Sequence, residues 1–203
     1  ASEPFALTVN PVNDAPVMDP IAAQATNEEV PLTITVSSSD IDWGTGPGDE
    51  NIPAYSAVSS NPDDVAVSVV GDQITMEPAL DFNGDVTITV TVTDDGLLSD
   101  ATDFVLTITP VNDAPALTEI GNQETDEDAS LILTLEAEDV DEDDLTFSAV
   151  SQYPGNVAAA VTGNQLTLTP AGDWNGSVNI SVTVSDGELT DSETFALTVN
   201  PVN

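Results

Sequence analysis

Apolar and polar residues alternate with a period of two along much of the chain. Leu, Ile or Val occupies every second position in residues 32–36, 65–69 and 86–92. Because successive side chains of a β-strand point to opposite faces, this pattern predicts strands with one buried and one solvated face. Turn-forming pairs separate the runs at Gly71-Asp72, Asn83-Gly84 and Asp95-Gly96. We find no helical periodicity, so the pattern predicts an all-β protein.

The succession of strands and turns occurs twice. The pentapeptide VNDAP stands at residues 12–16 and again at residues 111–115, each time after a strand-like run. Later landmarks also recur, since Asp81-Phe82-Asn83-Gly84 corresponds to Asp173-Trp174-Asn175-Gly176. The first copy carries an additional Gly-rich loop within residues 43–50. The chain is therefore a tandem array of related units joined at VNDAP.

Two domains account for this repetition, one in residues 11–110 and one in residues 111–203. Each unit is long enough to bury a core of its own. About seven strands per unit, without helices, are typical of an immunoglobulin-like sandwich. We therefore predict two tandem immunoglobulin-like, seven-stranded Greek-key β-sandwiches.

Residues 1–10 resemble the last strand of a preceding repeat. Residues 5–13 are identical to residues 195–203, which close the second repeat. One interpretation is a simple boundary within a longer array. The other is that this apolar strand adds to a sheet of a neighbouring molecule, which would make residues 1–10 a site of homotypic assembly.

The charge of the chain restricts its partners. It contains 37 Asp and Glu residues and no Lys, Arg or His, which gives a formal net charge of −37. Such a charge destabilises a compact state by self-repulsion, so bound cations or solvent screening must offset it. Nucleic acids are excluded as partners because no side chain can neutralise a phosphate. The sequence has no Cys for disulfides and no apolar run of membrane-spanning length, so we expect no direct membrane insertion.

The acidic residues are concentrated in particular segments. The strand-like runs 86–93, 165–169 and 178–185 contain no acid. Adaptation to high salt would instead spread Asp and Glu over all solvent-facing positions. Most of the acidic clusters recur between the repeats, as Asp94 and Asp186 do. This distribution favours localised cation sites, with general halophily as a second reason for the lack of Lys and Arg.

The clustered side chains have the chemistry of a calcium site. Ca²⁺ takes six to eight oxygen ligands from carboxylates, carbonyls, Asn side chains and water. In an extended Asp-x-Asp segment such as Asp139-Val140-Asp141, both carboxylates point to one side. The linker adds the amide of Asn112 and the carboxylate of Asp113 before a stiff Ala-Pro step. Zinc and copper are disfavoured because the chain has no His or Cys.

These motifs resemble the cadherin repeat, and more closely the bacterial cadherin-like repeats of large secreted adhesins and surface proteins. Residues 137–141 fit the motif A-x-D-x-D, and Leu80-Asp81-Phe82-Asn83 resembles LDxE with Asn in place of Glu. The linker at residues 110–115 lacks the leading Asp of the family's DxNDNAP linker and one residue before Ala-Pro. The resemblance implies Ca²⁺ between consecutive repeats, with fewer or weaker ions per joint than in animal cadherins.

The resemblance also implies which residues bind Ca²⁺, because in such families the ligands come from both repeats that flank a linker. The complete joint would use Glu28 or Glu29, Asp81, Asn112, Asp113, Asp139, Asp141 and Asp186. A half-joint near the beginning of the chain would use Asn13, Asp14, Asp40, Asp42 and Asp94. A half-joint near its end would use Glu127 or Asp128, and Asp173.

The function implied by the resemblance is structural and adhesive. The chain would be a calcium-rigidified repeat segment of an extracellular bacterial adhesin, stalk or surface filament, secreted or at the cell surface, with neighbouring repeats as its partners. We expect no enzyme, because catalysis needs a positioned base or nucleophile and only carboxylate pairs of the kind used in glycoside hydrolysis are available.

The alternative is a carbohydrate-binding module of a secreted, polysaccharide-associated protein. In that case an exposed Trp43, which has no counterpart in the second repeat, would stack on a sugar. The other large aromatic residues are expected to be core residues. Tyr55 would correspond to Phe147, and Trp174 to Phe82.

Overall fold

The computed structural model describes residues 12–41, 43 and 53–203. The strand predicted for residues 1–10 and the candidate ligand Asp42 lie outside these residues. The chain separates into two compact units, with the boundary between Val111 and Asn112. We refer to these units as the first and the second domain.

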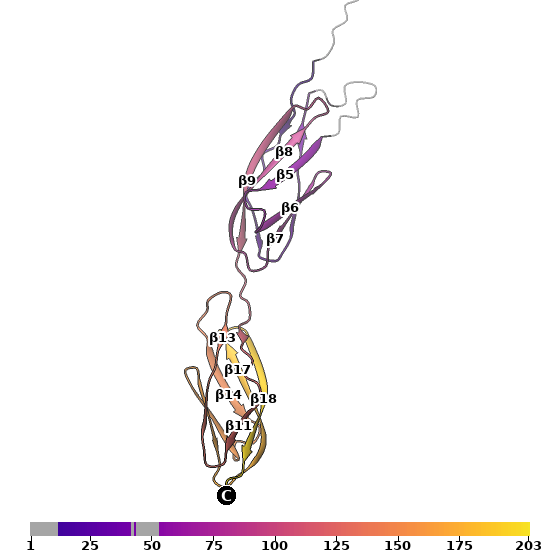
Figure 1. The fold of residues 1–203 in the computed structure, drawn as a ribbon. Coiled ribbons are helices and arrows are strands. Elements are labelled where there is room, and N and C mark those ends of the chain that lie inside the picture. Colours follow the sequence, from indigo (N-terminus) through magenta and orange to yellow (C-terminus); the bar gives the residue numbers. More distant parts are fainter. Residues whose placement is uncertain (1–11, 42, 44–52) are drawn as a thin grey trace, which may run out of the picture. The chain divides into compact units, whose positions relative to one another are not determined.

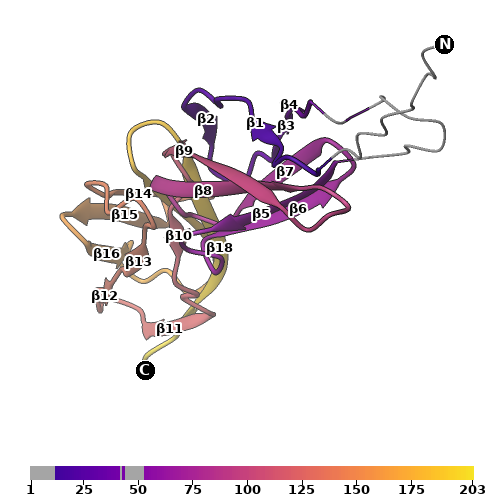
Figure 2. The ribbon, with the colours of Figure 1, turned by 90° about the horizontal axis from the view of Figure 1, so that it is seen from above.

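The first domain consists of β-strands in the part that the structure describes (Figure 1). Four strands form the sheet β2-β9-β8-β5, three form the sheet β3-β7-β6, and β1 pairs with β4. Figure 2 shows β5, β8 and β9 side by side within the larger sheet. The strands are β1 (Val17–Met18), β2 (Gln24–Asn27), β3 (Leu32–Thr35), β4 (Ser38–Ser39), β5 (Ala54–Ser59), β6 (Val65–Val70), β7 (Gln73–Pro78), β8 (Gly84–Thr93) and β9 (Ser99–Thr109).

The second domain repeats this arrangement. Its sheets are β11-β18-β17-β14 and β12-β16-β15, and β10 pairs with β13. The strands are β10 (Ala116–Leu117), β11 (Gln123–Asp126), β12 (Leu131–Thr134), β13 (Ala137–Glu138), β14 (Thr146–Ser151), β15 (Val157–Thr162), β16 (Gln165–Pro170), β17 (Gly176–Ser185) and β18 (Thr190–Asn200).

Among the described residues, each domain has the predicted seven strands once interrupted strands are counted as one. In the first domain, β1 and β2 are two parts of the opening strand, because β1 pairs with β4 whereas β2 crosses to pair in parallel with β9. β3 and β4 are likewise two parts of the second strand. The chain then alternates between the two sheets in the manner of a Greek-key sandwich. The predicted all-β, immunoglobulin-like fold is confirmed.

The alternation in the sequence determines which side chains form each core. The buried residues of β8 are Val86, Ile88, Val90 and Val92, and those of β17 are Val178, Ile180, Val182 and Val184. The residues between them, mostly Thr and Ser, lie on the outer face. Tyr55 and Phe82 pack against the first core, and Phe147 and Trp174 pack against the second, as predicted.

The part of the chain that the structure describes contains no helix with the length and apolarity that a membrane span requires.

Truncation of a central core residue tests this packing. Ile180 is fully buried in β17, so Ile180→Ala removes apolar burial and leaves a cavity. We expect the free energy of unfolding to fall by about 2–5 kcal/mol in chemical denaturation. The exposed Ser177→Ala in the same strand is the matched control and should change it by less than about 0.5 kcal/mol. Equal effects of the two variants would contradict this assignment of faces.

Candidate metal centre

Three carboxylates converge on the loop that follows β13. One oxygen from each of Asp139, Asp141 and Asp143 lies within 4.8 Å of the others, and we call these residues the aspartate cluster. The loop is folded by its own first residue, because Asp139 Oδ1 accepts the N–H of Asp141 at 3.0 Å and the N–H of Asp143 at 3.5 Å. Such local bonds from an Asp side chain to the following backbone are the reason that Asp favours turns.

The linker is bound to the same end of the second domain. The N–H of Asp113 donates to Asp141 Oδ2 at 2.8 Å, and Asn112 Nδ2 donates to Asp186 Oδ2 at 2.9 Å. The other oxygen of Asp186 accepts the N–H groups of Glu188 and Leu189 at 2.7 and 2.6 Å, which closes the turn between β17 and β18. At this end of the domain, the structure therefore brings together the five residues that the sequence predicts as ligands there: Asn112, Asp113, Asp139, Asp141 and Asp186.

One oxygen of the aspartate cluster has no protein partner. Asp139 Oδ2 is buried and receives no hydrogen bond from any of the described residues. A buried, unpaired carboxylate oxygen is costly, and its usual partners in proteins are N–H groups, cationic side chains or metal ions. The chain contains no Lys, Arg or His that could supply a positive charge. The donor set, made of hard oxygen ligands, fits a cation such as Ca²⁺.

Two carboxyl groups at this site have shifted pKa values, in opposite directions. Desolvation raises the pKa of Asp143 above its ordinary 3.8, and repulsion from Asp139, Asp141, Asp186 and Glu188 raises it further. In contrast, the hydrogen bond from Asn112 lowers the pKa of Asp186, assisted by the backbone amides of its turn. Asp186 is thus stabilised as an anion by the protein itself, whereas Asp143 is not.

Asp143 was not among the predicted ligands. The signal was present, because Asp139, Asp141 and Asp143 extend the Asp-x-Asp spacing by one more step. The first repeat has no acid at the corresponding position, so the comparison between repeats did not reveal it.

The first domain has part of the same arrangement. Asn13 Nδ2 donates to Asp94 Oδ2 at 2.9 Å, as Asn112 does to Asp186. Asp94 is only 4% exposed, and its Oδ1 accepts the N–H of Leu98 at 2.8 Å. Gly96 lies beside this bond, and a Cβ there would lie 2.4 Å from Asn13 Nδ2, so a larger residue would force the Asn13 side chain to shift. Of the other predicted ligands at this end, Asp14 is exposed and Asp40 is half-buried, while Asp42 lies outside the described residues.

The predicted glutamates at the other end of each domain hold the following linker. Glu28 is only 4% exposed and accepts the N–H of Val111, the residue after β9 and Pro110. Glu127 accepts the N–H of Val202 at 2.8 Å in the same way and also binds Asn175 Nδ2 at 3.2 Å. These contacts make Glu28 and Glu127 anchors of the chain that leaves each domain.

The remaining predicted ligands at these ends share an unusual backbone conformation. Glu29, Asp81, Asp128 and Asp173 have φ angles of 59°, 56°, 63° and 58°. Residues with a side chain adopt this left-handed region at an energetic cost. Asp173 N–H also donates to Asp128 Oδ1 at 3.3 Å, so these two turns are in contact within the second domain. The same conformation at equivalent positions of both domains makes it a feature of the repeat.

Other carboxylates serve the fold in a way that the sequence did not indicate. Asp100 Oδ2 accepts the N–H of Met18 at 2.8 Å, and Asp191 Oδ2 accepts the N–H of Leu117 at 2.9 Å. These bonds attach the short strands β1 and β10 to β9 and β18. The sequence gives no signal for this role of an Asp on a strand, because the partner amides lie 82 and 74 residues away along the chain.

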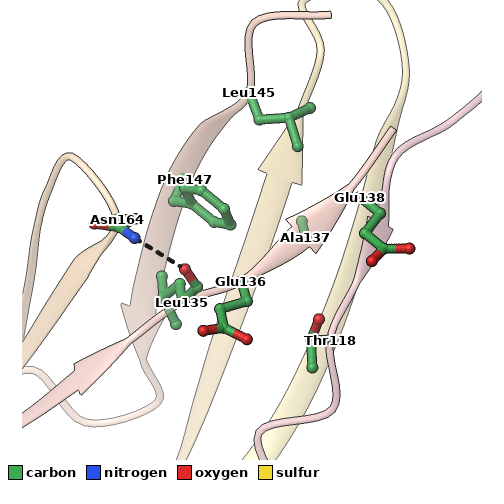
Figure 3. A pocket seen from close by; sticks show the side chains of 8 residues that line it. All are labelled: Thr118, Leu135, Glu136, Ala137, Glu138, Leu145, Phe147 and Asn164. Carbon is green, nitrogen blue, oxygen red and sulfur yellow. Dashed lines mark hydrogen bonds between the residues drawn. The ribbon is translucent and has the colours of Figure 1, made fainter. Parts of the chain in front are cut away.

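A cavity of about 480 Å³ lies in the second domain, lined by residues of β13 and β14 and of the neighbouring segments. Figure 3 shows its apolar side chains, which include Leu135, Leu145 and Phe147, together with Glu136 and Glu138. Asn164 donates from Nδ2 to the Leu135 carbonyl at 3.3 Å across its wall. The lining of the cavity includes the two carboxylates Glu136 and Glu138 and no basic side chain.

Trp43 lies half-buried against the first core. The carbohydrate hypothesis assumed an exposed indole ring at this position, and the packing leaves less of the ring for a sugar to cover.

Comparisons with known proteins agree with this architecture. Residues 111–200 match the family model of a cadherin-like domain, and residues 13–107 match that of a bacterial Ig domain. The predicted resemblance to bacterial cadherin-like tandem repeats is confirmed by these two matches. No curated protein matches the chain. Domains of these two kinds are typically non-catalytic structural modules of extracellular proteins.

Several solved structures are similar in fold. A two-domain fragment of human mucin-like protocadherin has a TM-score of 0.51 and 18% identity, and the match covers 92% of this chain and 98% of that one. Drosophila N-cadherin has a TM-score of 0.40 and 13% identity over 94% of this chain and 69% of its own. An endo-fucoidan hydrolase of glycoside hydrolase family 107 has a TM-score of 0.38 and 18% identity, and the match covers 97% of this chain but only 30% of the enzyme. The likeness to the protocadherin fragment supports the fold, and none of these likenesses carries information about activity.

The raised pKa of Asp143 predicts how pH affects the second domain without metal. A carboxyl group whose pKa is raised by folding destabilises the folded state above that pKa, and the penalty disappears below the ordinary value of 3.8. Asp143→Asn should therefore raise the unfolding temperature in chelator at pH 7, and this gain should vanish as the pH falls below 3.8. Asp126→Asn on β11 is the control. A gain that is independent of pH would contradict the assignment.

The hydrogen bond between Asp191 and the N–H of Leu117 on β10 should stabilise the second domain. Asp191→Ala leaves the N–H of Leu117 without its acceptor, which should lower the free energy of unfolding by about 1–3 kcal/mol. Asp191→Asn keeps an acceptor oxygen and should lose less. Chemical denaturation of both variants, in chelator, separates the lost hydrogen bond from the lost charge. If Asn and Ala cost the same, the hydrogen bond to Leu117 does not stabilise the domain.

Proposed function

We propose that this pair of cadherin-like and Ig-like domains is a calcium-rigidified segment of an extracellular bacterial adhesin, stalk or surface filament. The observation that carries the proposal is Asp139 Oδ2, a buried carboxylate oxygen without a partner among the described residues. It belongs to a cluster of three acids in a chain that has no cationic side chain. A bound Ca²⁺ would supply the missing positive charge and accept the remaining oxygens as ligands.

The connectivity of the chain supports a role at the joint. Gly84 pairs with Ile108 near the end of β9, which places the preceding turn with Asp81 at the end of the first domain from which the linker leaves. Glu28 lies at this end as well, because its N–H donates to Thr109 O at 3.1 Å. The linker then enters the second domain at the aspartate cluster. Acids therefore flank the linker on both sides in the order of the chain.

The mechanical consequence follows from charge. Carboxylates crowded around a linker repel one another and favour conformations that separate them. A bound Ca²⁺ would replace this repulsion with attraction, because carboxylates of both domains would bind the same ion. Its ligands would be Asn112, Asp113, Asp139, Asp141 and Asp186 of the second domain, with Glu28 or Glu29 and Asp81 of the first. In the same way, Asn13, Asp14, Asp40, Asp42 and Asp94 would meet ligands from a preceding repeat, and Glu127 or Asp128 and Asp173 would meet those of a following one. Neighbouring repeats are thus the first partners we propose.

Calcium titration tests the proposal. At a free Ca²⁺ concentration of 100 times Kd, binding to the folded state stabilises it by about 2.7 kcal/mol. We expect thermal unfolding to shift upward in Ca²⁺ relative to chelator, and small-angle scattering to show a narrower range of particle dimensions. Asp139→Asn should weaken calcium binding by at least about tenfold, which corresponds to 1.4 kcal/mol.

The matched control is Asp126→Asn, which removes the same charge from β11, away from the aspartate cluster. It should leave the affinity for Ca²⁺ unchanged. Identical unfolding curves in Ca²⁺ and in chelator, or equal effects of the two substitutions, would refute a calcium site at this position.

A further inference from the structure

A long segment of the second domain contains almost no acidic residues. Residues 145–172 contain no Asp or Glu, in a chain with 37 acidic residues. Residues 174–185 also contain none, so Asp173 is the single acid between Leu145 and Ser185. These residues form β14, β15, β16 and β17. None of the domain's carboxylates therefore lies on these four strands.

The topology places part of this acid-free segment along one side of the sandwich. β14 is the outermost strand of the sheet β11-β18-β17-β14, and β15 is the outermost strand of the sheet β12-β16-β15. The two strands lie next to each other and are joined by residues 152–156. We call β14, β15 and this connection the neutral side. The opposite edge of the larger sheet is β11, which carries Glu124 and Asp126.

The neutral side is exposed and partly apolar. Val150 on β14 is 68% exposed, and Tyr153 after it is 53% exposed. Ser148, Ala158 and Ala160 are exposed on the same two strands. β14 pairs with β17 along one edge and has no strand on its other edge among the described residues. Natural proteins usually block such an edge with charged side chains, proline or a bulge. This domain has many carboxylates and places none of them on either strand.

We propose that the neutral side is an interface between two copies of this chain, joined by pairing of β14 with β14. Two chains of charge −37 repel each other, and without Lys or Arg no ion pair can form between them. They can approach closely only where carboxylates are absent. Backbone hydrogen bonds between edge strands supply attraction that needs no charged side chain. This inference is independent of the proposed calcium site.

Symmetry defines the geometry of the pair. Two identical edges related by a two-fold axis run antiparallel and extend the four-stranded sheet into a continuous sheet across both copies. Ser148 and Val150 point to the outer face of this sheet, so each would lie near its equivalents in the second copy. Tyr153 lies just beyond the strand, where it can cover the end of the shared ladder.

Sedimentation velocity of the full chain over a range of concentrations tests the interface. We expect reversible dimers whose association strengthens when NaCl is raised from 0.15 M to 1 M, because salt screens the repulsion. Val150→Asp places a charge on the pairing edge and should weaken association by at least about tenfold. Thr198→Asp places the same charge on β18 beside Glu124 and should have a much smaller effect. Thermal unfolding of both variants checks that they are folded.

Cross-linking provides a second measurement that does not depend on weakened association. The chain has no cysteine, so Ser148→Cys and Val150→Cys each introduce a single thiol. Mild oxidation should give covalent dimers of at least one of these variants, and Thr198→Cys should remain monomeric. A chain that stays monomeric at all concentrations, or that associates equally well with Val150→Asp, would overturn the proposal. A monomer that instead binds a neutral polysaccharide through Tyr153 would also overturn it and would assign the neutral side to a sugar.

Discussion

The absence of every cationic side chain is the constraint on which the rest of the structure depends. With 37 acids and no Lys, Arg or His, each carboxylate must find its partner among N–H groups, hydroxyls, solvent or ions. Both domains direct carboxylates at backbone amides: Glu28 holds the outgoing linker, and Asp191 holds β10. Hydrogen bonds to an ionised acceptor are about twice as strong as neutral ones, so these acids stabilise the fold. Asp139 Oδ2 is a buried oxygen for which the described residues supply no such donor.

The placement of the remaining acids separates two kinds of surface. Loops at the ends of each sandwich gather carboxylates whose repulsion a cation can relieve. The side formed by β14 and β15 has none on its strands, so it opposes the approach of a second polyanion less than the acidic ends do. The ends and the sides of a repeat can therefore have different partners, metal ions and neighbouring repeats in the first case and another copy of the chain in the second.

Much of the candidate site could be predicted because its signal is local. Asp139 and Asp141 are two residues apart, and the linker repeats its Asn-Asp pair in both copies. The bond from Asn112 to Asp186 was not predictable in the same way, although both residues had been selected as ligands. It depends on a contact between positions 74 residues apart. For Trp43 the prediction from sequence was an exposed sugar-binding position, because the second repeat has no corresponding residue. The folded domain instead packs Trp43 against the core.

The sequence by itself determined the two sandwiches, their repeat and the clustering of acids in the segments that join the repeats. These properties follow from period-two alternation and from comparison between the copies, which do not require knowledge of distant contacts. Only the tertiary structure decided which carboxylates bind protein amides and which remain available. It also showed that Asp143 joins the cluster and that the acid-free residues of the second domain include two edge strands. These outcomes depend on strand order and on long-range hydrogen bonds, because a carboxylate acquires its role from the group that the fold places beside it.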